Sequence, residues 1–115
     1  MPVKKVKSLD YLDYLGSKRC VVSGKREPSL HHESVTRKYT GSMKGYFDFG
    51  AIPLDHEIHL YGRHAWGKNH FWEQYNLDPV KIVIELIEGY IEEGREDAEL
   101  AMNALEMIKE DNGYS

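Results

Sequence analysis

Two adjacent histidines, His31 and His32, lie in the stretch EPSLHHES at residues 27–34. In an extended segment, neighbouring side chains point to opposite faces. The two imidazoles therefore cannot easily serve one packing purpose, and the pair predicts two different roles at one place in the chain.

Four more histidines follow, His56, His59, His64 and His70, and all six lie in the first 75 residues. A pair of strands followed by a short helix would bring the histidine pair toward His59 and His64, around one ion. Imidazole suits borderline metals such as Zn, Ni, Mn or Co, and a three-histidine site can also present Mg with open positions. The sequence does not select the metal. His56 and His70 are more simply explained as residues without a chemical role.

The segments around these histidines have local patterns that predict their structure. Ser8 is a candidate N-cap of a short helix that ends at Gly16. Residues 29–36, SLHHESVT, are expected to be extended, and residues 46–54, YFDFGAIPL, to form a second strand that ends at its proline. Together they predict a hairpin connected by a basic loop, residues 37–45. The apolar residues of the first helix recur at helical spacing: Leu9, Leu12 and Leu15.

Helices are predicted after this hairpin. Asp55 is a candidate N-cap of a short helix whose length two glycines limit. Residues 69–76 form another turn of helix and place Phe71 and Trp72 in the core. Asp78, followed by a proline, begins an apolar and buried helix over residues 80–94. A final amphipathic helix covers residues 95–111, with apolar residues at spacings of three and four: Leu100, Ala104 and Met107.

The composition is that of a single domain over residues 1–115. Hydrophobic residues make up 41% of the 115 residues and charged residues 30%, as in ordinary globular proteins. No apolar run could span a bilayer, and the start MPVKKVKSLDYLDYLG lacks the apolar core of a secretion signal, so a cytoplasmic protein without a membrane partner is expected. Cys20 is the only cysteine, so any metal would be bound mainly by histidine and carboxylate.

Charge is unevenly distributed within the net charge of −4. Residues 1–75 hold 12 Lys and Arg against 8 Asp and Glu, whereas residues 76–115 hold 3 against 11. Basic charge and histidines therefore coincide, which is compatible with an anionic substrate. The acidic part is most simply a helical pair with a solvated outer face. A homodimer surface and a surface that repels DNA are the alternatives.

A particular order of motifs runs through about residues 10–85: YLDYLGSKRCVVSG, PSLHHES, GSMKGYFDFGAIPL, HAWG, FW and LDP. In this order they resemble the phage and prophage HNH endonucleases of the ββα-metal class, in particular recombination-type nucleases. The resemblance implies an α+β fold with a ββα-metal (His-Me finger) core over about residues 17–78. An N-terminal helix and a C-terminal helical extension, about residues 79–111, would flank that core. The implied activity is metal-dependent hydrolysis of DNA phosphodiester bonds inside a bacterial host.

The resemblance also assigns a role to each candidate residue. His31, His59 and His64 would bind one divalent ion, which could be Mg, Mn, Ni or Zn. His32 would be the general base that activates water, because histidine as a residue type can accept a proton near neutral pH. Asp48 would brace the base or its loop. The ion would steady the phosphate charge and the departing 3′ oxygen.

The chain departs from the family pattern in two places. Closed structural zinc sites need four N or S ligands, and only one good ligand remains where the family has its second zinc, so that zinc is not expected. The corresponding positions are Cys20, Ser23, Asp55 and Ile58. Five residues separate His59 from His64, an awkward spacing on a regular helix. His56 with His59 is therefore a competing ligand pair.

Basic residues in the first part of the chain are candidates for contacts with the DNA phosphates that flank the cut. These residues are Arg37, Lys38, Lys44, Arg63 and Lys68. Each could equally be a solvated surface residue. The alternative to a nuclease is a catalytically inactive HNH-like module that binds DNA or a protein partner.

Overall fold

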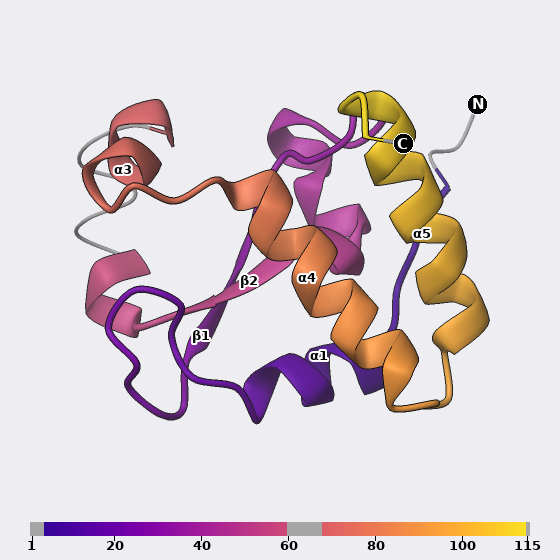
Figure 1. The fold of residues 1–115 in the computed structure, drawn as a ribbon, viewed down its shortest axis with the longest axis horizontal. Helices are drawn as coiled ribbons and strands as arrows, with labels where there is room; N and C mark the ends of the chain where they lie inside the picture. Colours follow the sequence, from indigo (N-terminus) through magenta and orange to yellow (C-terminus); the bar gives the residue numbers. More distant parts are fainter. Residues whose placement is uncertain (1–3, 60–67, 115) are drawn as a thin grey trace.

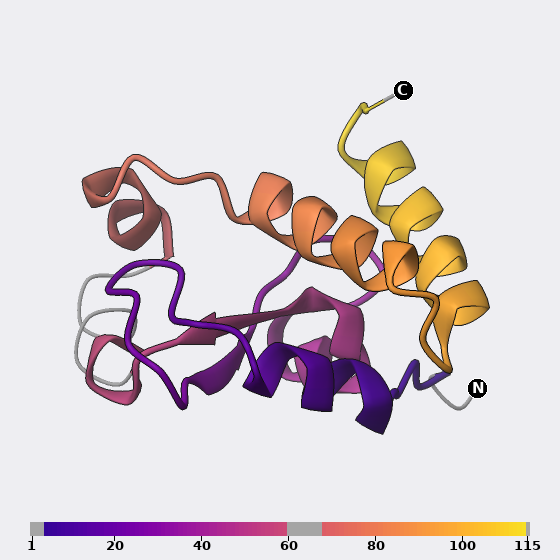
Figure 2. The ribbon, with the colours of Figure 1, turned by 60° about the horizontal axis from the view of Figure 1, so that its bottom comes forward.

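Helices and strands follow one another in nearly the predicted order. The computed structural model describes residues 4–59 and 68–114. Its elements are α1 (Leu9–Gly16), β1 (Ser29–His32), the 3₁₀ helices η1 (Gly41–Tyr46) and η2 (Asp48–Gly50), β2 (Ala51–Leu54), α3 (Lys68–Gln74), α4 (Pro79–Glu92) and α5 (Ala98–Asp111). They form an α+β domain. In Figure 2, α4 and α5 make an upper layer over α1 and the strands, and Figure 1 places α3 and α5 at opposite ends.

The first helix begins and ends at the predicted residues but buries a different face. The Ser8 hydroxyl accepts a hydrogen bond from the Tyr11 backbone N–H at 3.0 Å, as an N-cap does. Leu9 is exposed, whereas Tyr11, Tyr14 and Leu15 are buried. The expected leucine face is therefore wrong at its first position, because the two tyrosines offer more apolar area to the core.

The predicted hairpin is present and is short. β1 and β2 pair antiparallel, with His31 opposite Ile52 and His32 opposite Ala51. β2 is buried along its whole length. The register therefore presents the two histidines on opposite faces of a two-stranded sheet, with one face directed toward the turn that follows β2.

Residues 46–50 are not part of the second strand, which corrects the prediction for YFDFG. Gly41–Tyr46 and Asp48–Gly50 form 3₁₀ helices, and the intervening Phe47 bridges to Val6. The sequence alternates like a strand, but Phe47, Asp48 and Phe49 are all buried. In a strand, neighbouring side chains would point to opposite faces. The tight turn instead allows the rings of Phe47 and Phe49 and the Asp48 carboxylate all to point into the interior.

A helical turn begins directly after β2, as predicted from Asp55. The Asp55 carboxylate accepts the Glu57 N–H at 3.1 Å, and its carbonyl accepts the His59 N–H at 2.8 Å. Residues 56–59 are therefore helical, and the cap fixes where His59 enters the structure. The two glycines expected to limit this helix, Gly62 and Gly67, lie outside the described residues.

Of the two C-terminal helices, α4 packs on the hairpin and α5 packs on α4. Asp78 caps α4 by accepting the Val80 N–H at 3.0 Å. α4 packs on α5 and on β2, and Tyr90 contacts Tyr11 with ring centroids 5.0 Å apart. Each large apolar side chain buried here contributes roughly 1.5–3 kcal/mol. Within residues 4–59 and 68–114, no helix is both long and apolar enough to cross a bilayer.

Candidate active site

The two strand histidines face different surroundings, as expected for adjacent residues. His31 is buried and points toward the turn that carries His59. The His32 side chain is 26% exposed and points toward Asp48. The site therefore has two halves, one on each face of β1.

In the first half, His31 and His59 present one ring nitrogen each to the other. Nδ1 of His31 lies 3.1 Å from Nε2 of His59, and the ring planes meet at 65°. The outer nitrogens are also held. Nε2 of His31 lies 2.9 Å from Oε2 of Glu33, and Nδ1 of His59 lies 3.3 Å from Oγ of Ser29.

The outer contacts hold each ring at its second nitrogen. A neutral imidazole carries one N–H and one lone pair, so a His31 ring that donates to Glu33 through Nε2 offers the lone pair of Nδ1 to His59. The Ser29 hydroxyl beside His59 also donates to the Leu54 carbonyl at 3.1 Å. The two facing nitrogens can share a proton, as in a hydrogen bond between the rings, or a metal cation.

This arrangement fits two ligands of a divalent metal site. Two nitrogens bound tetrahedrally at about 2.0–2.1 Å from one ion are about 3.3 Å apart, close to the observed separation of the two rings. Metal-bound histidines in proteins commonly donate their second nitrogen to a carboxylate, as His31 does here. In the described part of the chain, no group of three or more His, Cys, Asp or Glu could hold an ion. His64, the expected third ligand, lies outside that part.

Glu33 is a buried acid that was not among the predicted site residues. It is 2% exposed, and its Oε2 accepts a hydrogen bond from Nε1 of Trp72 at 3.0 Å in addition to the contact with His31. Its backbone N–H donates to the Gly50 carbonyl at 2.9 Å, which continues the hairpin one residue beyond β1. The available signal was its position two residues after His31, because such residues share a face of an extended segment.

In the second half, Asp48 is fully buried and holds His32. Oδ1 accepts from Nε2 of His32 at 3.3 Å and from the Lys7 ammonium at 3.0 Å, and Oδ2 accepts the Ser8 N–H at 2.9 Å. Burial raises the pKa of Asp48, but these hydrogen bonds outweigh it and hold the pKa below its usual value. The carboxylate is therefore ionised, and His32 donates through Nε2 with Nδ1 left as its basic nitrogen.

The N-terminal segment connects this carboxylate to the C-terminal helices. The Ser8 hydroxyl donates to Asp97 at 2.5 Å, and the Asp97 N–H donates to the Tyr90 hydroxyl at 3.1 Å. Tyr90 in turn donates to Asp10 at 2.7 Å. Nothing local in the sequence marks Lys7 or Asp97, because their partners are distant along the chain.

The remaining predicted histidines contribute nothing visible to the two halves. His56 begins the turn that contains His59 and is exposed, and His70 is exposed on α3. The choice between His56 and His64 as a ligand stays a prediction. Arg63 also lies outside the described residues, as does the side chain of Lys68.

Three predicted basic residues lie in the connection between the strands. Arg37 and Lys38 are exposed and Lys44 is half-buried. The Arg37 backbone N–H donates to Asp111 at 3.2 Å, near the end of α5. Arg37 and Lys38 therefore lie on the α5 side of the molecule, at the end away from α3 (Figure 1).

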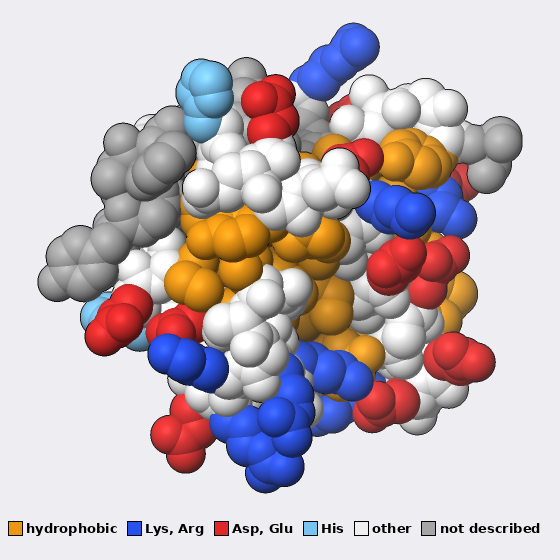
Figure 3. All heavy atoms as spheres, turned by 60° about the vertical axis from the view of Figure 1, so that its left-hand side comes forward, with side chains coloured by type: hydrophobic (Ala, Val, Ile, Leu, Met, Phe, Trp, Pro, Cys, Tyr) orange, Lys and Arg blue, Asp and Glu red, His pale blue; other side chains and the backbone are white. Residues whose placement is uncertain are grey.

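A second basic segment, the loop of residues 17–28, was not predicted as a binding surface. Lys25 pairs with Asp55 at 3.2 Å, so the loop adjoins the turn that carries His59. Figure 3 shows Lys and Arg side chains gathered along the lower edge of the face at this end. The signal was the repeated Lys-Arg pair: Lys18, Arg19, Lys25 and Arg26.

The predicted absence of a structural zinc concerns positions in this same region, among them Cys20 and Asp55. Cys20 is buried, and its sulfur accepts the N–H groups of Val22 at 3.4 Å and Ser23 at 3.3 Å. Burial raises the pKa of Cys20, but hydrogen bonds from Ser23, Asp55 and Val22 lower it below its usual value overall. The loop of residues 17–28 is therefore held by hydrogen bonds to the Cys20 sulfur and by the Lys25–Asp55 ion pair.

Comparison with protein-family models found no matching family, and comparisons with curated proteins and with solved structures found no significant match. The function is therefore inferred from the site's own geometry and chemistry.

Proposed function

We propose that this protein is a metal-dependent HNH-type endonuclease that hydrolyses DNA phosphodiester bonds, with β1, β2 and the helical turn of residues 56–59 as its ββα-metal core. The observation that carries the proposal is the pair of facing ring nitrogens on His31 and His59, 3.1 Å apart. Each ring is also held at its outer nitrogen by a polar side chain, as metal-bound histidines commonly are.

The metal would be held by His31 and His59, with His64 as the third ligand carried over from the resemblance. A bound Mg, Mn, Ni or Zn ion would polarise the scissile phosphate and offset charge on the departing 3′ oxygen. Glu33 and Ser29 fix the orientation of the two rings through their outer nitrogens. This support is worth about 10–100-fold in metal affinity in comparable sites.

His32 would act as the general base. Its Nδ1 takes a proton from water, and the water oxygen forms the new bond to phosphorus while the bond to the 3′ oxygen breaks. Asp48 holds the ring through Nε2 and stabilises the imidazolium that forms. Lys7 keeps that carboxylate ionised and places a second cation beside it.

The DNA backbone would be held by cations around the histidine site. The basic loop of residues 17–28 adjoins the turn with His59. The predicted residues Arg37, Lys38 and Lys44 follow β1, and Arg37 and Lys38 lie on the α5 side, where they would contact DNA that extends beyond the histidine site. Contacts of this kind bind phosphates without reading sequence. The acidic α4 and α5 would disfavour approach of the duplex from the other side.

A plasmid-nicking assay tests the proposal. Protein freed of metal by a chelator is incubated with supercoiled plasmid and Mg, Mn, Ni or Zn in separate reactions. We expect cleavage only with added metal, its loss in His32→Ala, and no change in His70→Ala, a matched exposed histidine. Nicking that survives in His32→Ala would contradict the assigned base. DNA binding without cleavage by any of the four metals would favour the inactive HNH-like module instead.

A further inference from the structure

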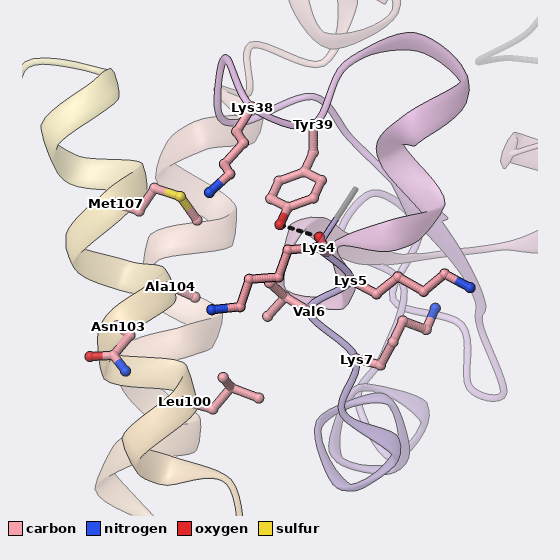
Figure 4. Close-up of a pocket in the computed structure, with 10 residues that line it drawn as sticks. All are labelled: Lys4, Lys5, Val6, Lys7, Lys38, Tyr39, Leu100, Asn103, Ala104 and Met107. Atoms are coloured by element: carbon pink, nitrogen blue, oxygen red, sulfur yellow. Dashed lines mark hydrogen bonds between the residues drawn. The ribbon is translucent and has the colours of Figure 1, made fainter. Parts of the chain in front are cut away.

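A cavity unrelated to the histidine site lies between the N-terminal segment, residues 4–7, and α5 (Figure 4). Its volume is about 290 Å³. This is just below the usual range for ligand sites, roughly 300–1,000 Å³. A small molecule, rather than a folded partner, is the occupant that such a volume suits.

The extended N-terminal segment divides its lysines between two sides. Lys5 and Lys7 point away from α5, whereas Lys4 points toward it (Figure 4). Lys7 binds Asp48 and the Gly45 carbonyl, and the Lys5 ammonium lies 5.1 Å from the ring centroid of Tyr46. Lys5 and Lys7 are therefore engaged by the body of the protein.

Lys4 and Lys38 reach the cavity from different elements. Both side chains project toward α5 over the same space (Figure 4). The Lys4 backbone is anchored there, because its carbonyl accepts the Tyr39 hydroxyl at 2.6 Å. Within residues 4–59 and 68–114, no ion pair or hydrogen bond engages either ammonium group. Two like charges over one cavity favour an anion between them.

The cavity floor is apolar and incompletely covered. Tyr39 and Ala104 are buried, whereas Leu100 and Met107 are only half-buried. The three floor residues of α5 lie on one face of that helix, as their spacing predicted. Each methylene that a ligand buried against this floor would raise its affinity about fourfold.

We propose that this cavity binds a small amphipathic organic anion. A phosphate or carboxylate head lies between Lys4 and Lys38, and an alkyl or aryl body lies on Leu100, Ala104 and Met107. The cavity is separate from the proposed catalytic residues, because none of these five side chains contacts the histidines or their carboxylates in the described structure. Lys38 is also one of the proposed DNA contacts, so DNA and the anion would compete for it.

Titration with octyl phosphate, followed by NMR of methionine methyl groups, tests the proposal. Met107 lines the cavity, whereas Met102, on the same helix, is 49% exposed and serves as the internal control. We expect a saturable shift of the Met107 methyl and none at Met102.

Two double variants test the role of the paired ammonium groups. The variant Lys4→Gln, Lys38→Gln should weaken binding of octyl phosphate at least about fivefold. The variant Lys81→Gln, Lys109→Gln removes the same charge from positions on α4 and α5 that do not line the cavity, and it should leave the affinity unchanged.

Three results would overturn this proposal. The first is the absence of a saturable Met107 shift with octyl phosphate while the protein keeps its native spectrum. The second is an affinity for octanol or for inorganic phosphate equal to that for octyl phosphate. Equal affinity for octanol would show that the lysines do not contribute, and equal affinity for inorganic phosphate would show that the apolar floor does not contribute. The third is an equal loss of affinity for octyl phosphate in the two double variants. That result would show that the net charge of the protein, and not the position of the two lysines, determines the affinity.

Discussion

The two faces of β1 treat adjacent histidines in opposite ways. His31 is 5% exposed and restrained at both ring nitrogens, by Glu33 and by His59. His32 is more open and is restrained at Nε2 by Asp48. Each face has its own buried carboxylate, Glu33 behind His31 and Asp48 behind His32. Under the proposed function, the immobile ring would suit a metal ligand and the more open ring would suit a base that must meet water.

Separate removal of the two histidines should give the largest effects. The two variants should differ in which property they change, the nicking rate or the metal affinity. Under the proposed function, His32→Ala lowers the single-turnover nicking rate about 10²–10⁴-fold, because the proton acceptor is lost, and leaves metal affinity unchanged. His31→Ala lowers both the nicking rate and the metal affinity. Nicking kinetics and metal titration calorimetry measure the two properties. Equal metal affinity in the two variants would show that the faces are not specialised.

Gly50→Ala should disturb the His31 face through the backbone. A Cβ at this position would lie 2.8 Å from the Glu33 carbonyl oxygen, and that backbone belongs to the hairpin. We expect the free energy of unfolding in urea to fall by about 2 kcal/mol. Gly45→Ala is the matched control, since its added Cβ meets nothing within 4 Å. A loss in Gly45→Ala as large as that in Gly50→Ala would contradict this explanation.

Glu33→Gln sharpens the comparison because it keeps the shape of the side chain and removes its charge. The carboxylate contacts the His31 ring, so the substitution acts on the His31 face. Metal affinity should fall roughly tenfold, as for other carboxylates behind metal-bound histidines. Glu57→Gln, an exposed acid in the neighbouring turn, should have no such effect. Unchanged affinity in a folded Glu33→Gln protein would exclude the positioning role.

Asp48→Asn should give the smallest effect, visible as a pH dependence. The folded-state pKa of Asp48 lies below its unfolded value, so its contribution is complete above about pH 4 and is lost as pH falls through the folded pKa. We expect the variant to be about 1 kcal/mol less stable at pH 6, with the difference shrinking toward acid pH.

Thermal melts from pH 6 downward measure that difference. Asp10 and Asp55 also have lowered pKa values, through Arg95 and the Glu57 N–H respectively, so both proteins keep part of the acid slope. Asp13→Asn, at an 84% exposed side chain, is the control. A difference between wild type and Asp48→Asn that grew toward acid pH would have the wrong sign.

The parts of the fold that depend on local chemistry could be predicted from the sequence. Ser8, Asp55 and Asp78 begin helices where their side chains accept backbone N–H groups. The hairpin follows from its extended segments, and its alternation separates His31 from His32. The tight turn in YFDFG could not be predicted, because it depends on the simultaneous burial of Phe47, Asp48 and Phe49, which only the complete core requires.

The candidate site was predictable to a similar extent. The approach of His59 to His31 follows from a strand, a cap and one helical turn. Lys7 lies 41 positions from Asp48 along the chain, and their pairing depends on how the N-terminal segment crosses η2. No pattern in the sequence contains that information. The position of Glu33 beside His31 could have been predicted, because residues two apart in a strand share a face.

Ser8 links the carboxylate that holds His32 to the C-terminal helices. Its N–H holds Asp48, the carboxylate that carries His32, and its hydroxyl reaches Asp97 at the start of α5. Segments that share buried hydrogen bonds of this kind open together. Amide protons of Ser8 and Asp48 should therefore exchange with solvent only when the whole domain unfolds, because the His32 half of the site and the C-terminal helices would form one cooperative unit.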